Sequence, residues 1–128
     1  MAIRIPTLRT IAMPTDTNPS GDIFGGWIVS QMDLAGGLVS SQRAKSRTAT
    51  AAISELSFIR PVHIGDTVTC YVEIIKVGNT SITTKIKTYA SDRIGGKEYK
   101  VTEGTFIFVA IDDNGKPWSV DEKNRTHN

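Results

Sequence analysis

Cysteine and long apolar runs are scarce in this chain of 128 residues. The one cysteine, Cys70, excludes a disulfide within the chain, and its place in an alternating apolar segment is typical of a small buried hydrophobic residue. No segment approaches the roughly 18 apolar residues that span a bilayer, and the opening sequence MAIRIPTLRT lacks the apolar stretch of a secretory signal. We therefore expect a cytoplasmic protein with no disulfide and no membrane partner.

A strong excess of charge is missing as well. The 15 basic and 13 acidic residues leave a net charge of +2, which is too small for the concentrated basic surface of a nucleic-acid-binding domain. The two histidines, His63 and His127, have no cysteine, second histidine or carboxylate cluster at metal-ligand spacing, so no metal site is expected. The chain also lacks a G-x-S-x-G sequence, which leaves a Ser-His-Asp triad without support.

One helical pattern and several extended patterns account for the apolar residues that are present. From Gly26 to about Ala44, apolar side chains recur every three or four positions, which predicts one long helix. A short strand ending at Pro14 precedes this helix, and four strands joined by short turns follow it, at about 48–61, 67–78, 80–90 and 98–112. One helix among several strands predicts an α+β domain, in which an antiparallel sheet packs one face on the helix.

The predicted strands are long, and a single helix covers little of the sheet that they form. Strands of about 10 to 14 residues exceed the usual five or six and imply a large, curved sheet that wraps the helix. The uncovered edges need another partner, and a second copy of the chain is the simplest one. We expect one domain at residues 1–118 that forms a homodimer or higher oligomer, and a polar tail at 119–128, with partial order from residue 112 onward.

Two glycines lie where the predicted helix begins. The backbone N–H groups of Gly25 and Gly26 have no partner within the helix, and glycine lets another group approach them closely. The helix dipole favours negative charge there, so this turn could polarise a carbonyl and hold an oxyanion. The simpler interpretation is a loop-to-helix junction capped by Asp22. Asn18 is either a routine turn residue before proline or an amide that donates to a carbonyl or orients a water.

Asp33 is the one carboxylate within the predicted helix. It lies roughly 120° around the helix from the apolar stripe, on the flank that carries Gly36 and Gly37. Each of these glycines lowers helix stability by about 1 kcal/mol relative to alanine, which indicates that another backbone, a second subunit or a ligand approaches this flank. A carboxylate beside such an approach is partly desolvated and becomes a stronger base. The alternative is a solvated aspartate on an exposed flank.

Three segments of the chain resemble a known family. The sequence AMPTDTNPSGDIFGGWIVSQMDLAGG resembles the opening of bacterial acyl-CoA thioesterases of the hotdog superfamily, in the YciA-type branch, and FIRPVHIGDTV and CYVEIIKVGNTSI resemble the strands that follow. The resemblance covers about residues 7–118. It implies a hotdog fold, in which a curved antiparallel sheet wraps a long helix and two protomers join their sheets, often with three such dimers in a hexamer. It also implies hydrolysis of the thioester that links coenzyme A to an acyl chain, without a cofactor.

The resemblance also assigns roles to the residues described above. It implies that Asp33 is the catalytic carboxylate, as general base or nucleophile, that Asn18 supplies a loop amide, and that the Gly25–Gly26 turn binds the thioester oxygen. The eight residues from Gly25 to Asp33 rise about 12 Å along a helix, which is too far for both to act on one carbon within a protomer. The implied site therefore spans the dimer, and Gly36 and Gly37 leave room there for the partner or the acyl chain.

Coenzyme A carries phosphates, so basic residues are expected around its nucleotide. Arg60 is the first candidate and Lys76 the second, and Ile59 and Asp22 complete the expected substrate-binding set. The basic group Arg43, Lys45 and Arg47 is a third option, although cations at the end of a helix are also favoured by its dipole.

Two other functions stay open at this point. A non-catalytic acyl-CoA or nucleotide sensor would use the same pocket without hydrolysis, although no attached helix-turn-helix indicates a repressor. An enoyl-CoA hydratase or dehydratase of the same superfamily would place a histidine near the helix, and residues 1–62 contain none. That absence disfavours the hydratase interpretation.

Overall fold

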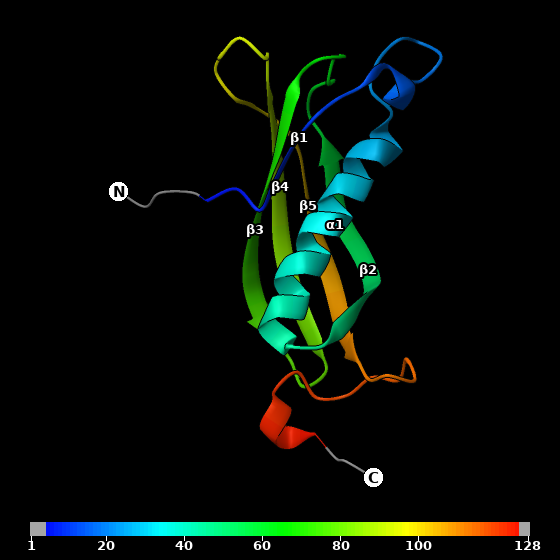
Figure 1. The fold of residues 1–128 in the computed structure, drawn as a ribbon, viewed down its shortest axis with the longest axis vertical. Helices are drawn as coiled ribbons and strands as arrows, with labels where there is room; N and C mark the ends of the chain where they lie inside the picture. The colour runs from blue at the N-terminus through cyan, green and yellow to red at the C-terminus, as the bar shows by residue number, and fades with distance from the viewer. Residues whose placement is uncertain (1–4, 126–128) are drawn as a thin grey trace.

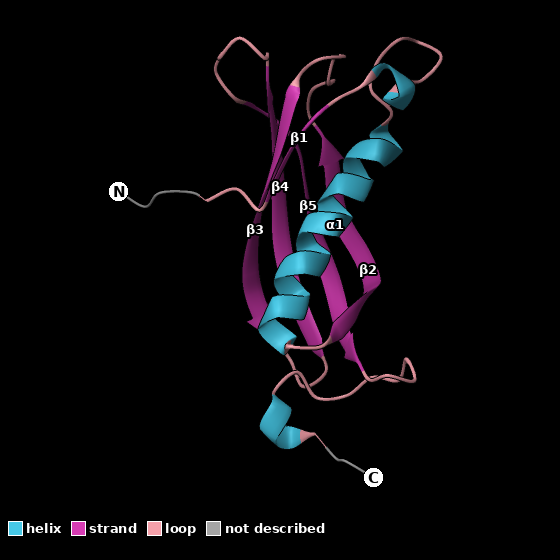
Figure 2. Cartoon of the chain, viewed as in Figure 1, coloured by secondary structure: helices cyan, strands magenta, loops and turns pink. Residues whose placement is uncertain are grey.

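The structure is a computed structural model that describes residues 5–125 of the chain. In chain order its elements are β1 (Leu8–Ile11), the 3-10 helix η1 (Pro14–Asp16), α1 (Gly25–Ala44), β2 (Arg47–Phe58), β3 (Thr67–Val77), β4 (Ser81–Ser91), β5 (Tyr99–Ile111) and the 3-10 helix η2 (Glu122–Asn124) (Figure 2). His127 and the chain ends at 1–4 and 126–128 lie outside the described residues. Within residues 5–125, no helix is both long and apolar enough to cross a membrane.

All five strands form one antiparallel sheet in the order β1-β3-β4-β5-β2. The helix α1 lies across one face of this sheet (Figure 1), which confirms the α+β class that the sequence predicts. The first strand is shorter than predicted, because it ends at Ile11 and the chain then turns into η1 at Pro14. The strand β2 lies at the outer edge of the sheet, and its other side pairs with β5.

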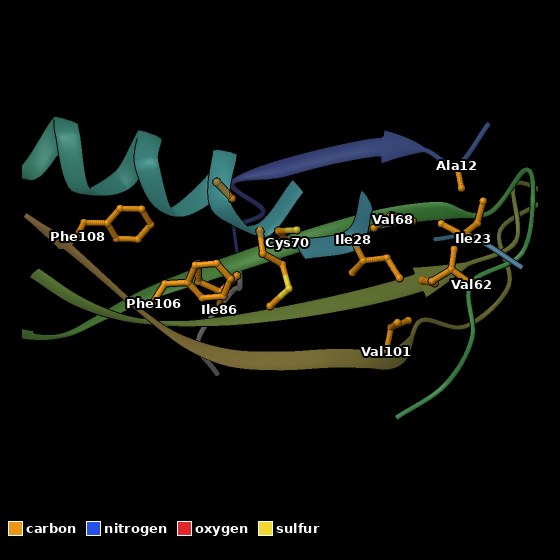
Figure 3. Close-up of a cluster of buried hydrophobic side chains, with 13 residues drawn as sticks. Ala12, Ile23, Ile28, Val62, Val68, Cys70, Ile86, Val101, Phe106 and Phe108 are labelled. Carbon is orange, nitrogen blue, oxygen red and sulfur yellow. The ribbon is translucent and has the colours of Figure 1, made fainter. Parts of the chain in front are cut away.

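The hydrophobic core lies between α1 and the sheet (Figure 3). The helix turns Ile28, Met32 and Ala35 toward the sheet, as the apolar stripe predicts, and each is at most 3% exposed. Alternating side chains of β4 and β5, among them Phe106, meet the helix from below. Cys70 is fully buried in this core, as predicted, and burial raises the pKa of its thiol. Burial of each large apolar side chain contributes about 1.5–3 kcal/mol, so this layer holds the helix in place.

Gly36 allows α1 to approach the sheet closely. A Cβ atom at this position would lie 2.5 Å from Cζ of Phe108 and 2.8 Å from Cδ1 of Ile86. The expectation that Gly36 leaves room for a partner or an acyl chain is therefore wrong, because the sheet of the same chain fills that space. A Cβ atom on Gly37 would have no neighbour within 4 Å, so the same expectation for Gly37 stays a prediction.

The segment after β5 packs on the domain more closely than its polar sequence predicts. Val120 is 1% exposed and joins a second apolar cluster with residues of α1, β4 and β5. Arg125 donates from Nη2 to the carbonyl oxygen of Ala44 at 2.6 Å, at the C-terminal end of α1. The sequence predicts only partial order from residue 112 onward, and the described part of this segment, up to Arg125, is more closely packed than that. The division into a domain ending at residue 118 and a tail stays a prediction.

Candidate active site

The helix α1 begins without a capping side chain. Its N-cap residue is Phe24, in an extended conformation, and no side chain accepts a hydrogen bond from the first turn. Within residues 5–125, no acceptor pairs with the backbone N–H groups of Gly25 and Gly26. The alternative that Asp22 caps the helix is therefore excluded for the described geometry. Two donors at the positive end of the helix dipole remain free to bind an oxygen.

Asn18 organises the loop that leads into α1. Its Oδ1 atom accepts hydrogen bonds from the backbone N–H groups of Ser20 at 2.9 Å and Asp22 at 3.1 Å. This is the turn role that the sequence left open as the simpler interpretation. The Nδ2 group of Asn18 has no acceptor in the part of the chain that the structure describes, so it can still donate to a ligand. The turn holds the amide beside the helix start.

A hollow lies beside the start of α1, and we call it the donor hollow. It has a volume of about 260 Å³ and is lined by Ile23, Gly25, Ile28, Phe58, Ile59, Arg60, Pro61 and Val62. The structure thus brings together one of the two predicted oxygen-binding glycines and two of the predicted substrate-binding residues, Ile59 and Arg60. The walls are mainly apolar, while the free N–H group of Gly25 and the guanidinium of Arg60 supply polar contacts.

Arg60 is oriented by an aromatic ring of β5. The Cζ atom of its guanidinium lies 5.3 Å from the centroid of the Tyr99 ring. The Tyr99 hydroxyl donates to Oδ2 of the buried Asp66 at 3.0 Å. Burial and this contact with Asp66 raise the pKa of Tyr99 to about 12, although Arg60 acts in the opposite direction. The Tyr99 hydroxyl therefore stays protonated, as a donor, at neutral pH.

Asp33 lies in the third turn of α1, half-buried, on the side that faces β2. The hydroxyl of Thr50 donates to its Oδ1 atom at 2.5 Å. This short, charge-assisted hydrogen bond fixes the carboxylate and leaves Oδ2 available to a ligand or a water. The sequence did not single out Thr50, because only the packing of β2 against α1 reveals which of several threonines meets Asp33.

A second hollow surrounds this carboxylate, and we call it the acid hollow. It has a volume of about 400 Å³ and is lined by Asp33, Leu34, Gly37, Ser41, Arg47, Thr48, Thr50 and Phe108. None of these residues lines the donor hollow. Gly25 and Asp33 are separated by a helix rise of about 12 Å, and in one protomer they line two different hollows. Neither hollow contains both the oxygen-binding N–H groups and the carboxylate.

The remaining candidates are scattered. Lys76 pairs with Thr83 near the end of β3 and does not line the donor hollow. Oδ1 of Asp22 lies 3.8 Å from Nδ1 of His63, on the surface. Arg43 forms an ion pair with Asp121 at 3.2 Å, which occupies one member of the basic group at the helix end. In the described part of the chain, no three metal-ligating side chains lie together.

Known proteins are similar in sequence to this chain over most of its length. Residues 20–96 match the family described as "Thioesterase superfamily". The chain is 48% identical over 114 residues to the acyl-CoA thioester hydrolase YciA of Salmonella typhimurium, and the match covers 86% of this chain and 85% of that protein.

Solved structures share the fold. The structure of a mutant of HI0827, a hexameric broad specificity acyl-coenzyme A thioesterase, superposes with a TM-score of 0.88 at 40% identity, over 97% of this chain and 91% of that one. The hexameric thioesterase y2039 from Yersinia pestis gives a TM-score of 0.88 at 42% identity, over 95% and 99% of the two chains. The chain therefore belongs to the thioesterase superfamily and has the hotdog fold. The resemblance to YciA-type proteins, noted from three sequence segments, is confirmed by the identity over most of the chain.

Proposed function

We propose that this protein hydrolyses acyl-CoA thioesters to a carboxylic acid and free coenzyme A. The observation that carries the proposal is that one helix, α1, holds both two free N–H groups at its start and a half-buried carboxylate, Asp33, that accepts a hydrogen bond from Thr50. Two of its similar proteins, from Salmonella typhimurium and Escherichia coli, are named acyl-CoA thioester hydrolases, which supports the same substrate class here. Coenzyme A is part of the substrate, and the proposed chemistry uses protein groups without a cofactor.

The thioester carbonyl binds with its oxygen at Gly25 and Gly26. These N–H groups withdraw charge from the carbonyl and stabilise the oxyanion that forms on attack. In the first route, Asp33 accepts a proton from a water whose oxygen bonds to the carbonyl carbon. The C–S bond then breaks, and this proton passes to the departing sulfur to give the thiol of coenzyme A. In the alternative route, Asp33 attacks the carbon itself and coenzyme A leaves as the thiolate, which takes a proton from water; a second water then hydrolyses the acyl–Asp33 anhydride to the carboxylic acid. Nδ2 of Asn18 donates to the carbonyl oxygen or orients the water.

The complete site is formed by two chains that pair along β2. This strand runs from the acid hollow, at Thr50, to the donor hollow, at Phe58. An antiparallel pairing of β2 with its own copy places the beginning of one strand beside the end of the other. The acid hollow of each protomer then adjoins the donor hollow of its partner. The carboxylate of one chain and the N–H donors of the other can then act on the same thioester, which they cannot do within one protomer.

The outer edge of β2 supports this dimer. The strand is 12 residues long, and its outer side has no partner strand in the described residues. A long unpaired edge is an association site. Large apolar side chains are exposed here: Ile53 on β2 is 42% exposed, and Leu34, which lines the acid hollow with Thr50, is 62% exposed. Similar proteins are described as hexameric, so we propose three such dimers per assembly. We also propose a cytoplasmic location, with which the free thiol of Cys70 agrees.

Arg60 is the proposed contact for a coenzyme A phosphate, because it lies in the donor hollow with free guanidinium donors. Ile59 contributes an apolar wall to the same hollow. Asp22 and Lys76 stay weaker proposals, since neither lines the donor hollow in one protomer.

A thiol-release assay with a series of acyl-CoA substrates tests the proposed function. We expect turnover by the wild type and a decrease in kcat of about 10²-fold or more in Asp33→Asn, which keeps the shape of the side chain but removes its charge. Asp113→Ala, at an exposed turn, is the matched control and should keep full activity. Acyl-CoA binding without thiol release would favour the sensor, and hydration of an enoyl-CoA without thiol release would favour the hydratase.

A further inference from the structure

The side chain of Arg60 is exposed but not randomly placed. Its guanidinium lies over the ring of Tyr99, with Cζ 5.3 Å from the ring centroid. In the described part of the chain, no acceptor forms a hydrogen bond or ion pair with this guanidinium. A cation–π contact uses none of the N–H donors of the guanidinium, so they stay available to an anion. An arginine held in this way presents a planar fork to an incoming anion.

The ring of Tyr99 is itself anchored. Its hydroxyl donates to Asp66 at 3.0 Å, and Asp66 is only 8% exposed. The same Oδ2 atom of Asp66 also accepts a hydrogen bond from the backbone N–H of His63, at 2.9 Å. The ring is therefore tied to the loop that connects β2 with β3, the loop that also carries Arg60.

The backbone at Arg60 is tied to the same strand. The N–H of Ile59 donates to the carbonyl oxygen of Val101 at 2.7 Å, and the N–H of Arg60 approaches that oxygen at 3.4 Å. Val101 follows Tyr99 by two residues on β5. The backbone and the guanidinium of Arg60 therefore both contact one segment of β5, at Val101 and Tyr99.

We propose that Tyr99 is a positioning residue, which holds the Arg60 guanidinium beside the donor hollow so that it binds a phosphate of coenzyme A. This inference rests on the proposed function. Gly25 and Arg60 line the same hollow, so Arg60 is within reach of the nucleotide of an acyl-CoA whose carbonyl binds at Gly25. Because the arginine is already oriented, less side-chain freedom is lost when the phosphate binds.

Three substrates with one common acyl group separate this role from a structural one. They are the acyl-CoA, the acyl-dephospho-CoA, which lacks the 3′-phosphate, and the acyl-pantetheine, which lacks all the nucleotide phosphates. We expect Arg60→Ala to raise KM for the acyl-CoA about 10-fold or more, because a charge-assisted phosphate contact is lost. Tyr99→Leu should raise KM about three- to five-fold, the scale of an exposed cation–π contact. Neither change should alter kcat.

Acyl-pantetheine provides the decisive comparison. We expect wild type, Arg60→Ala and Tyr99→Leu to share one KM for this substrate, since it carries no phosphate. An equal rise in KM for acyl-pantetheine would overturn the proposal. The dephospho substrate identifies the phosphate: an effect that persists there indicates the diphosphate, and an effect that disappears indicates the 3′-phosphate. Both results support a phosphate contact.

Two further variants guard against misfolding and indirect effects. Tyr99→Phe keeps the ring under Arg60 and should stay within about two-fold of the wild-type KM. Tyr89→Leu makes the same change of side chain on β4; as the matched control, it should leave KM for the acyl-CoA unchanged. In the Arg60→Ala background, Tyr99→Leu should cause no additional rise, because it acts through Arg60. Full additivity would refute that link.

Failure of the proposed function and failure of this inference give different results. If the wild type releases no thiol from any of the three substrates, the proposed function fails. Calorimetric binding of free coenzyme A still tests the phosphate contact in that case, with weaker binding by Tyr99→Leu expected and equal binding contradicting the inference.

Discussion

Thr50 on β2 donates its hydroxyl hydrogen to Oδ1 of Asp33 on α1, across 2.5 Å. The two residues are 17 positions apart in sequence, and their contact joins the helix to the strand at the edge of the sheet. A carboxylate held by one oxygen keeps the other oxygen in a fixed direction. The proposed chemistry depends on that direction.

Replacing Thr50 by valine tests this relationship. Thr50→Val keeps the branched shape but removes the donor, so we expect kcat to fall about 10-fold with little change in KM. Thr50→Ser keeps the hydroxyl and should retain most of the activity. Steady-state kinetics of the three proteins with one acyl-CoA provide the measurement. Equal kcat values for Thr50→Val and the wild type would show that the hydrogen bond has no part in the reaction.

The N–H group of Gly25 can be removed without breaking the helix. Proline is tolerated at the first helical position, and the preceding Phe24 is extended, with φ −62° and ψ 129°. We expect Gly25→Pro to lower kcat about 10²-fold, the scale for loss of one oxyanion donor. Gly25→Ala keeps the N–H group and should remain active, since its Cβ atom would lie 3.5 Å from the Phe58 ring, an ordinary contact. A fully active proline variant would exclude this donor.

Gly36 and Gly37 should respond oppositely to alanine. Gly36→Ala places a methyl group against Phe108 and Ile86, and overpacking of this kind costs about 1–3 kcal/mol. Gly37→Ala meets no neighbour within 4 Å, so better helix propensity should add up to about 1 kcal/mol of stability. Urea unfolding of both variants at one protein concentration makes the comparison. Destabilisation by Gly37→Ala instead would indicate a close neighbour from another chain at that position.

The raised pKa of Tyr99 predicts that the free energy of unfolding depends on pH. Its pKa is raised from 10.0 to about 12 in the folded chain, so the unfolded chain loses this proton first as the pH rises. The stabilisation is complete below pH 10 and is lost progressively toward pH 12. We expect the stability advantage of the wild type over Tyr99→Phe to shrink from about pH 10 to about pH 12 in urea unfolding. A constant difference would mean that the hydroxyl titrates alike in both states.

The local patterns of the sequence predicted most of the fold. The apolar stripe at Ile28, Met32 and Ala35 identified the buried face of α1, because a helix repeats its facing side every three or four residues. The alternation in β4 likewise separated Ile86 from the exposed side of the sheet. Such periodicities depend on neighbouring residues alone, so the α+β class and the order of elements followed from them.

Long-range contacts were beyond these patterns. Glycine carries no side chain, so no periodicity indicated that Gly36 faces Phe108. The pairing of Thr50 with Asp33 depends on how far β2 slides along α1, which no local signal sets. Asp33, Gly25 and Arg60 were selected from residue chemistry and family resemblance. Their division between two hollows emerged only from the packed chain.

Mixing two inactive variants tests the shared active site most directly. Asp33→Ala lacks the acid and Gly25→Pro lacks a donor, so each alone should be nearly inactive. Random pairing of the two chains after joint refolding gives mixed dimers in which one site receives both intact halves, and about a quarter of wild-type activity is expected. If each protomer holds a complete site, the mixture stays as inactive as its components, and that result would contradict the account.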